Sequence, residues 1–203
     1  ISLFPNILKS FPKSGQWINS IKIVLGFLEL ALALKFLSNA DLVSHWGILK
    51  REVFISIWAL ISILTSLYLF GIYRFPNEIK QKINVSRKII GAIFFIFSIY
   101  LIQGIFYSNN LKLLSGFSPP IYYSLNSSPS ECPLNLNCYK DFNKGKKIAE
   151  KLNKPILIDF TGWACINCRR MEENVWSNPE VYQILKNQIV LISLYVDDRT
   201  KLS

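Results

Sequence analysis

Three long apolar stretches dominate the first half of the chain. Residues 53–73 and 89–107 run for 21 and 19 residues without a charged side chain. A helix that rises about 1.5 Å per residue would cross a hydrocarbon layer of about 30 Å over such a length. Residues 18–37 form a third, weaker candidate, because they carry three charged side chains. The pattern predicts three transmembrane helices, at about 18–37, 53–73 and 89–107.

The pattern of the second half is typical of an α/β domain. Residues 141–152 place Phe142, Ile148, Ala149 and Leu152 on one helical face, with lysines around it. Shorter elements follow: an apolar run suited to a central parallel strand, a helix after the cysteines, a helix that starts at Asn178 and Pro179, and a second apolar strand. The apolar run covers residues 155–160, the helix after the cysteines covers 169–175, and the second apolar strand covers 189–196. These three elements form a strand–helix–strand unit.

Composition divides the chain between these two halves. Ser and Pro are frequent between residues 115 and 130, and both residues disfavour helix continuation and keep a tether extended and solvated. We therefore expect a transmembrane region at 1–110, a linker at 111–131 and an incomplete α/β domain at 132–203. All four cysteines lie in the last of these parts.

The charge pattern predicts how the chain is oriented. The net charge is +10, but the basic residues are scattered and form no stripe with interleaved aromatic residues, which argues against nucleic acid as a partner. The loop from Arg74 to Lys88 holds five basic residues and one acid, whereas the loop at 38–52 is balanced. Because positive charge resists translocation, we expect the N-terminus and the Arg74 loop in the cytoplasm and the C-terminal domain outside it. The helical half would be in contact with membrane lipid.

Two polar residues, Glu29 and His45, lie in the otherwise largely apolar helical half. Glu29 would lie near the middle of the membrane, where a carboxylate needs a polar partner. We favour a contact with helices outside this chain over a part in an electron relay. His45, the only histidine, has no Cys, Asp or Glu at ligand spacing, and we expect a loop or interfacial residue.

Cys165 and Cys168 carry the predicted chemistry. They stand at the predicted strand-to-helix turn, where exposed amides and the helix dipole favour thiolate over thiol. Cys165 is therefore the expected nucleophile, and Cys168, one helical turn further on, would resolve a mixed disulfide. Asp159, at the inner end of the strand, is placed to be a buried carboxylate that exchanges a proton with Cys168.

Other uses of the four cysteines remain open. A zinc site of Cys132, Cys138, Cys165 and Cys168 is disfavoured because the first pair has five intervening residues and the second follows a strand. We expect a structural disulfide between Cys132 and Cys138 in a small loop outside the cytoplasm, with a relay pair as the alternative.

Several motifs resemble one family. Residues 154–160, the Cys165–Arg169 segment and the run from Met171 to Val181 are similar to the C-terminal thioredoxin-like domain of the DsbD family, bacterial inner-membrane thiol:disulfide interchange proteins. Residues 11–17, with Gly26 and Phe27, look like the start of a membrane helix of that family. The resemblance implies that the Cys165 and Cys168 pair is redox-active, that Asp159 matches a buried acid and that Glu172 matches a second acid near the pair.

The resemblance also implies a place in a chain of electron transfer. Proteins of the family take electrons from cytoplasmic thioredoxin and pass them, through membrane cysteines, to periplasmic thiol–disulfide proteins that serve disulfide isomerisation and cytochrome c maturation. No cofactor or metal is implied. The predicted function is a membrane-anchored protein-disulfide reductase of the bacterial inner membrane with a periplasmic C-terminal domain. The alternative is a membrane-anchored metal-binding or assembly module.

Three features depart from the family pattern. Residues 1–131 hold no cysteine, so we expect that this chain alone cannot carry electrons across a membrane. Ala164 stands directly before the first cysteine, where the family has Trp, and Trp163 comes one place earlier. Only 35 residues follow Cys168, so we expect a piece of a longer protein, whose domain continues with further strands and a cis-proline loop.

Overall fold

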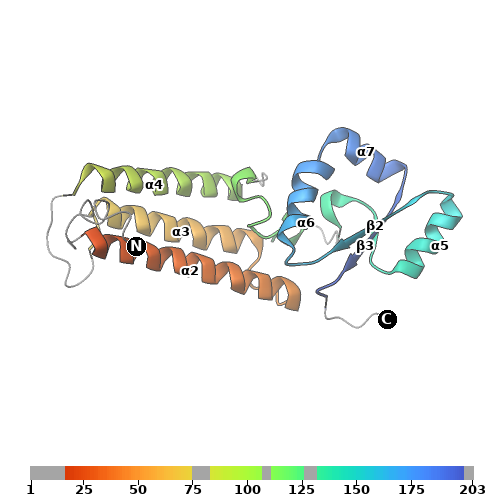
Figure 1. Ribbon diagram of the computed structural model, residues 1–203, viewed down its shortest axis with the longest axis horizontal. Helices are drawn as coiled ribbons and strands as arrows, with labels where there is room; N and C mark the ends of the chain where they lie inside the picture. The colour runs from red at the N-terminus through yellow and green to blue at the C-terminus, as the bar shows by residue number, and fades with distance from the viewer. Residues whose placement is uncertain (1–16, 75–82, 107–110, 126–131, 199–203) are drawn as a thin grey trace, which may run out of the picture.

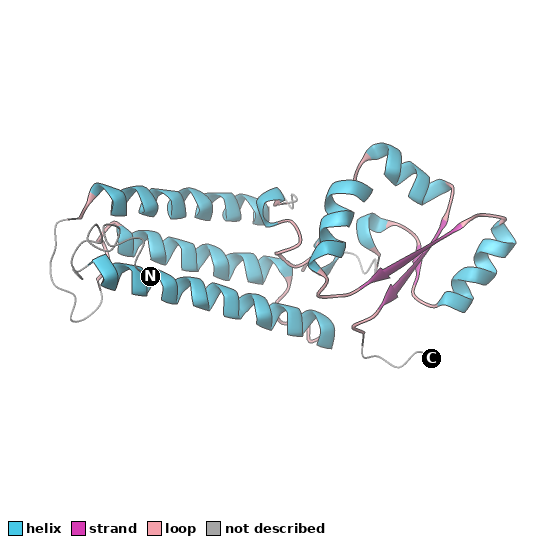
Figure 2. Ribbon diagram, in the orientation of Figure 1, coloured by secondary structure: helices cyan, strands magenta, loops and turns pink. Residues whose placement is uncertain are grey.

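The computed structural model describes residues 17–74, 83–106, 111–125 and 132–198. Three long helices lie beside a smaller α/β part at residues 132–198 (Figure 1). The sequence predictions for the N-terminal segment, the centre of the Arg74–Lys88 loop, the end of the linker and the last five residues lie outside the described residues. The helical half and the α/β half predicted from the sequence are both present (Figure 2).

The three helices match the three predicted apolar stretches in place, with different ends. They are α2 (Trp17–Ser44), α3 (Arg51–Leu69) and α4 (Val85–Phe106). Among the described residues, α3 and α4 are long and apolar enough to cross a membrane, by length and composition. The third predicted crossing, in α2, stays a prediction. Glu29 is exposed on the surface of α2.

Polar side chains inside the helical part tie its helices together. The Ser62 hydroxyl donates to the Phe94 carbonyl at 2.8 Å, and the Ser66 hydroxyl donates to the Gly91 carbonyl at 2.9 Å. Both bonds join α3 to α4. Small hydroxyl residues at such positions let two helices approach closely while their polar groups stay satisfied. Trp58 of α3 donates its ring N–H to a carbonyl of α2.

Residues 111–125, the connecting segment, are folded rather than extended. They contain two 3₁₀ turns, Lys112–Leu114 and Ile121–Tyr123. The buried Arg51 guanidinium donates to the Ser118 hydroxyl at 3.0 Å and to the Pro119 carbonyl at 2.7 Å. The solvated tether expected from composition is therefore wrong for these residues. Ser and Pro here supply hydrogen-bond acceptors to a buried arginine, which composition alone does not distinguish from solvation.

The α/β part is a small parallel sheet with helices on both faces. The strand order is β1–β3–β2, and both strand pairs are parallel. Along the chain the elements are η3 (Pro133–Asn135), β1 (Cys138–Tyr139), α5 (Phe142–Leu152), β2 (Ile156–Thr161), α6 (Ile166–Met171), η4 (Glu172–Trp176), α7 (Pro179–Asn187) and β3 (Val190–Tyr195). The predicted strand–helix–strand unit is β2–α6–β3.

The core of the α/β part lies on the two sides of β3. Val190 and Ile192 pack against Ala149 of α5, whereas Leu191 packs with Trp176 and Leu185. Alternate residues of a strand point to opposite faces, so α5 covers one face and η4 with α7 covers the other. Two side-chain caps begin the outer helices, because Asp141 and Asn178 each accept a backbone N–H.

The strand at 155–160, predicted to be central, lies at one edge of the described sheet. β3 is the central strand, and three apolar residues of β2 are between 37% and 41% exposed: Ile156, Leu157 and Ile158. An uninterrupted apolar run indicates a strand with two coverable faces but carries no signal for its position in the strand order. The C-terminal end of β2 leads directly into the turn that carries Cys165.

Candidate functional site

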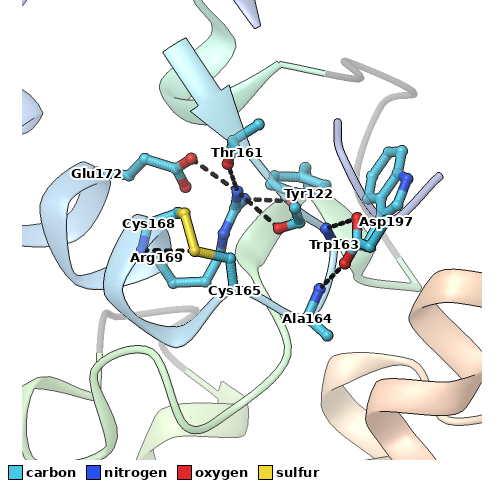
Figure 3. The surroundings of a disulfide bond; sticks show 10 residues. Tyr122, Thr161, Trp163, Ala164, Cys165, Cys168, Arg169, Glu172 and Asp197 are labelled. Atoms are coloured by element: carbon cyan, nitrogen blue, oxygen red, sulfur yellow. Dashed lines mark hydrogen bonds and ion pairs between the residues drawn. A yellow bond between two sulfur atoms is a disulfide. The ribbon is translucent and has the colours of Figure 1, made fainter. Parts of the chain in front are cut away.

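Cys165 and Cys168 form a disulfide at the turn between β2 and α6. Cys165 is the N-cap of α6, and its Sγ accepts the backbone N–H of Cys168 at 3.2 Å (Figure 3). Their Cα atoms are 5.3 Å apart, and both residues are partly exposed. In the reduced state, a helix N-terminus stabilises negative charge on this first sulfur. The arrangement can accept a nucleophile or, once reduced, supply one.

The turn that leads to Cys165 is held by a carboxylate that the sequence analysis missed. Asp197, two residues after β3, accepts the backbone N–H of Trp163 at 2.7 Å and that of Ala164 at 3.0 Å (Figure 3). Gly162 lies directly against this carboxylate, since a Cβ there would stand 2.9 Å from Asp197 Oδ2. No local motif marks Asp197, because its partners are 33 and 34 residues away.

We expect Gly162→Ala to destabilise the α/β part by about 1–2 kcal/mol, because the new methyl group displaces Asp197 from two backbone amides. Urea unfolding followed by tryptophan fluorescence measures this loss. Gly26→Ala is the matched control, because nothing lies within 4 Å of a Cβ at that position. Equal unfolding midpoints for the two variants would contradict the role given to Asp197.

Trp163 is buried beneath the turn that leads to Cys165. It is 7% exposed, and its ring stacks on Tyr195 with centroids 4.2 Å apart. Its ring N–H donates to Asp198. The ring of His45, just after α2, meets the Trp163 ring edge-on with centroids 4.8 Å apart. Its Nε2 stands 3.8 Å from Asp198 Oδ1. The predicted loop histidine therefore contacts the α/β part, which its position in the sequence did not reveal.

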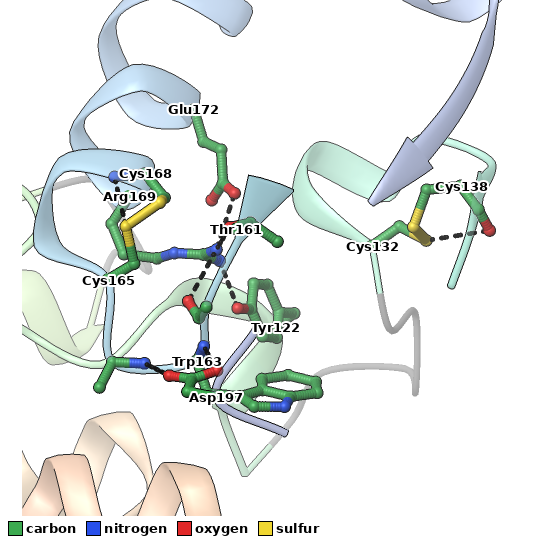
Figure 4. A network of polar contacts seen from close by, with 12 residues as sticks. Tyr122, Cys132, Cys138, Thr161, Trp163, Cys165, Cys168, Arg169, Glu172 and Asp197 are labelled. Carbon is green, nitrogen blue, oxygen red and sulfur yellow. Dashed lines mark hydrogen bonds and ion pairs between the residues drawn. A yellow bond between two sulfur atoms is a disulfide. The ribbon is translucent and has the colours of Figure 1, made fainter. Parts of the chain in front are cut away.

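A buried arginine lies under the disulfide. Arg169 is 3% exposed, and its Nη2 donates to Thr161 Oγ1 at 3.0 Å and stands 2.9 Å from Glu172 Oε1. Its Nη1 donates to the Tyr122 hydroxyl (Figures 3 and 4). Arg169 is buried, whereas its neighbour Arg170 is exposed. The site therefore joins β2, α6, η4 and the connecting segment.

Both predicted acids lie close to this arginine. Burial raises the pKa of Glu172 to about 8, against the opposing charge of Arg169. Burial also raises the pKa of Asp159, opposed by Ser193 and by Arg169. Asp159 shares the strand face of Thr161, and its Oδ2 is buried without a hydrogen-bond partner in the described part of the chain. Glu172 can thus hold a proton near neutral pH, and Asp159 holds its proton to a higher pH than an exposed aspartate does.

The raised pKa of Glu172 predicts a pH dependence of stability. Between the ordinary value of 4.5 and about 8, the folded protein keeps a proton that the unfolded chain has released, so stability falls as pH rises through this window. We expect Glu172→Gln to match the wild type in urea midpoint near pH 4 and to exceed it above about pH 8. Glu150→Gln, at an exposed site on α5, should keep the wild-type slope. A slope that survives in Glu172→Gln would contradict this assignment.

Cys132 and Cys138 form a second disulfide, with Cα atoms 5.8 Å apart. Cys138 opens β1 and pairs with Leu191 of β3. Figure 4 shows this disulfide apart from the Cys165–Cys168 pair, on the other side of the Arg169 cluster. Within the described ranges, no group of three or more His, Cys, Asp or Glu side chains gathers as metal ligands would.

The chain is similar in sequence to known thiol:disulfide interchange proteins. The sequence model of a family described as thioredoxin-like matches residues 137–203. Proteins named thiol:disulfide interchange protein DsbD are similar over most of the chain. The relative from Campylobacter jejuni (strain RM1221) is 27% identical over 185 residues, 91% of this chain and 30% of its own length. That from Pseudoalteromonas atlantica is 26% identical over 182 residues, and that from Escherichia coli K12 is 22% identical over 192 residues; they cover 89% and 94% of this chain and 27% and 29% of their own lengths.

The chain thus spans less than a third of the length of these relatives. The resemblance predicted from the sequence motifs is confirmed, since both the helical and the α/β halves fall within the aligned length.

Proposed function

We propose that this chain, a DsbD-type sequence with a thioredoxin-like C-terminal part, is a thiol:disulfide oxidoreductase that works through Cys165 and Cys168. The observation that carries the proposal is the disulfide at the start of α6, with Cys165 as N-cap. A lone pair of cysteines two residues apart has several uses, but this placement with two raised-pKa acids beside a buried arginine suits disulfide exchange.

The exchange balances without a cofactor. In the reduced chain, the Cys165 thiolate attacks one sulfur of a partner disulfide, which forms a mixed disulfide and releases the other partner sulfur as a thiolate. Cys168 loses its proton and attacks Cys165 Sγ, which closes the Cys165–Cys168 disulfide and releases the second partner sulfur. Two electrons pass to the partner, and two protons end on its thiols. The pair has then returned to the oxidised state seen in the structure.

The two acids have distinct supporting roles in this proposal. Asp159, on the β2 face that also bears Thr161, accepts the Cys168 proton as that sulfur becomes a nucleophile. Glu172, with its pKa near 8, sets the charge beside Arg169 and changes it within the working pH range. Cys132 and Cys138 act as a structural disulfide that fixes the start of β1 against β3.

We further propose that the helical part anchors the domain in a bacterial inner membrane, with the domain on the periplasmic face. Charge supports this orientation, because the Arg74–Lys88 loop holds five of the basic residues. The arrangement agrees with it, since the connection between α2 and α3 and the end of α4 lie at the end of the helices nearest the α/β part (Figure 1). Periplasmic thiol–disulfide proteins are the proposed acceptors. Electrons would come, ultimately from cytoplasmic thioredoxin, through a dithiol outside residues 1–131.

The activity is tested by stoichiometric reduction of a protein disulfide. The chain, reduced and freed of reductant in detergent micelles, is mixed with insulin, and free insulin thiols are counted by mass. We expect one insulin disulfide reduced per chain, and none when Cys165 and Cys168 are both replaced by serine. The Cys132→Ser, Cys138→Ser chain should keep the activity. Insulin reduction that survives loss of Cys165 and Cys168 would reject the proposal.

A further inference from the structure

The Arg169 guanidinium, which lies under the Cys165–Cys168 disulfide, has one hydrogen-bond partner from outside the thioredoxin-like part. Tyr122 belongs to the connecting segment, 47 residues before Arg169, yet its hydroxyl accepts a hydrogen bond from Arg169 Nη1. The guanidinium carbon lies 5.4 Å from the Tyr122 ring centroid. Burial raises the pKa of Tyr122 well above its ordinary value, so the hydroxyl stays neutral and acts on Arg169 as a dipole.

Contacts on both sides hold Tyr122 in this place. The next residue, Tyr123, donates its hydroxyl to Asp41 at 2.8 Å and accepts the Gly47 N–H at 2.9 Å. These bonds fix the segment to Asp41 near the end of α2 and to Gly47 in the connection between α2 and α3. On the side of the α/β part, the Gly116 N–H donates to the Glu173 carboxylate of η4 at 3.2 Å. Gly116 has φ +71°, and a Cβ there would stand 2.6 Å from the Ile166 carbonyl, so the segment lies directly on α6.

The contacts of the Arg169 guanidinium come from separate parts of the chain. It donates to the Tyr122 hydroxyl, to the Thr161 hydroxyl of β2 and, over a longer distance, to the Gly162 carbonyl. It also forms an ion pair with the Glu172 carboxyl of η4. A guanidinium is planar and rigid, so its orientation follows from the acceptors that it meets together. Loss of the Tyr122 acceptor leaves Nη1 without this partner and lets the group turn away from Glu172.

We propose that Tyr122 is a positioning residue for disulfide exchange: by fixing the Arg169 guanidinium it sets the charge of Glu172 beside the cysteines. This inference rests on the proposed function. The redox site is thereby sensitive to whether the connecting segment is docked, because the same short turn carries Tyr122 towards Arg169 and Tyr123 towards Asp41.

The test compares Tyr122→Phe with Tyr182→Phe, which also loses one hydroxyl, because Tyr182 of α7 donates its hydroxyl to the Leu134 carbonyl. The whole 203-residue chain is reduced in detergent micelles, and the rate of Cys165 alkylation by iodoacetamide is measured from pH 5 to 10 by peptide mass spectrometry. A weaker hold of Arg169 on Glu172 leaves that carboxyl protonated to higher pH and removes a negative charge near the thiolate. We therefore expect the half-maximal alkylation rate of Tyr122→Phe at a pH lower by about half a unit, and that of Tyr182→Phe at the wild-type pH.

A Glu172→Gln background separates this route from a general structural effect. There Tyr122→Phe should cause no further shift, because the group through which it acts no longer titrates. An unchanged profile in Tyr122→Phe, an equal shift in both Tyr→Phe variants, or a shift that persists with Glu172→Gln overturns the inference. If Tyr122→Phe does not fold, Arg169→Lys replaces it, since lysine keeps the charge without the planar fork. A wild-type profile in Arg169→Lys also overturns the inference.

Insulin reduction by the wild-type chain separates a failure of the proposed function from a failure of the role given to Tyr122. Absence of that activity rejects the proposed function, whereas intact activity with an unshifted Tyr122→Phe profile rejects only the role of Tyr122.

Discussion

Cys168→Ala chains accumulate as a mixed disulfide between Cys165 and the protein whose disulfide they attack. Without Cys168, no second sulfur lies one helical turn from Cys165 to release the partner. After reduction and exposure to insulin, we expect the trapped adduct on non-reducing gels to exceed that of the wild type by about tenfold or more. Peptide mapping should place the link at Cys165.

Cys165→Ala is the matched control for this trap. It keeps Cys168, which lies within α6 and not at its N-cap, and should give almost no adduct. Strong trapping through Cys168 in that variant would reverse the assignment of nucleophile and resolving sulfur. Equal adduct levels in the two variants would show that neither position is special.

Arg169→Ala lowers the free energy of unfolding by about 3 kcal/mol at neutral pH. Loss of the guanidinium leaves the hydroxyls of Thr161 and Tyr122 and the carboxyl of Glu172 without this partner. Thr161 and Glu172 are buried. Each buried acceptor left unsatisfied costs about 1–3 kcal/mol, and the two hydroxyl groups recover part of this by rotation. Urea unfolding monitored by the fluorescence of Trp163 and Trp176, both buried in the α/β part, measures the loss.

Arg170→Ala provides the comparison at the next residue. Arg170 is exposed and donates only a long bond, 3.4 Å, to the Ser115 carbonyl. Its loss should change stability by less than about 0.5 kcal/mol. If the two variants unfold at the same urea concentration, the buried cluster under the disulfide does not stabilise the domain as described.

Local patterns in the sequence were enough to predict the elements around the site. The apolar run before Asp159, the Cys165–Cys168 spacing and the Asn178-Pro179 start each depend on neighbouring residues, and the structure has β2, α6 and α7 at these places. The site roles of Cys165, Cys168, Asp159 and Glu172 stay predictions, to be decided by the experiments described above.

Contacts between distant residues were beyond the sequence patterns. Tyr122 and Asp197 reach the site from 47 and 33 or more residues away, and no spacing rule connects them to it. The connecting segment was predicted as a solvated tether because Ser and Pro are frequent in tethers. Nothing in its composition shows that Arg51 would bury itself against Ser118 and Pro119. The rank of β2 in the sheet likewise depends on which strands pair, not on its own residues.

The relative alkylation rates of Cys165 and Cys168 show which of the two sulfurs is the nucleophile. The fully reduced chain is treated briefly at pH 6 with a limiting amount of iodoacetamide, and modified peptides are counted by mass spectrometry. The sulfur at the start of α6 should react at least about tenfold faster than Cys168, because only it has the exposed amides of the helix start to stabilise a thiolate. Equal rates, or a faster reaction at Cys168, would contradict the account of Cys165 as the attacking sulfur.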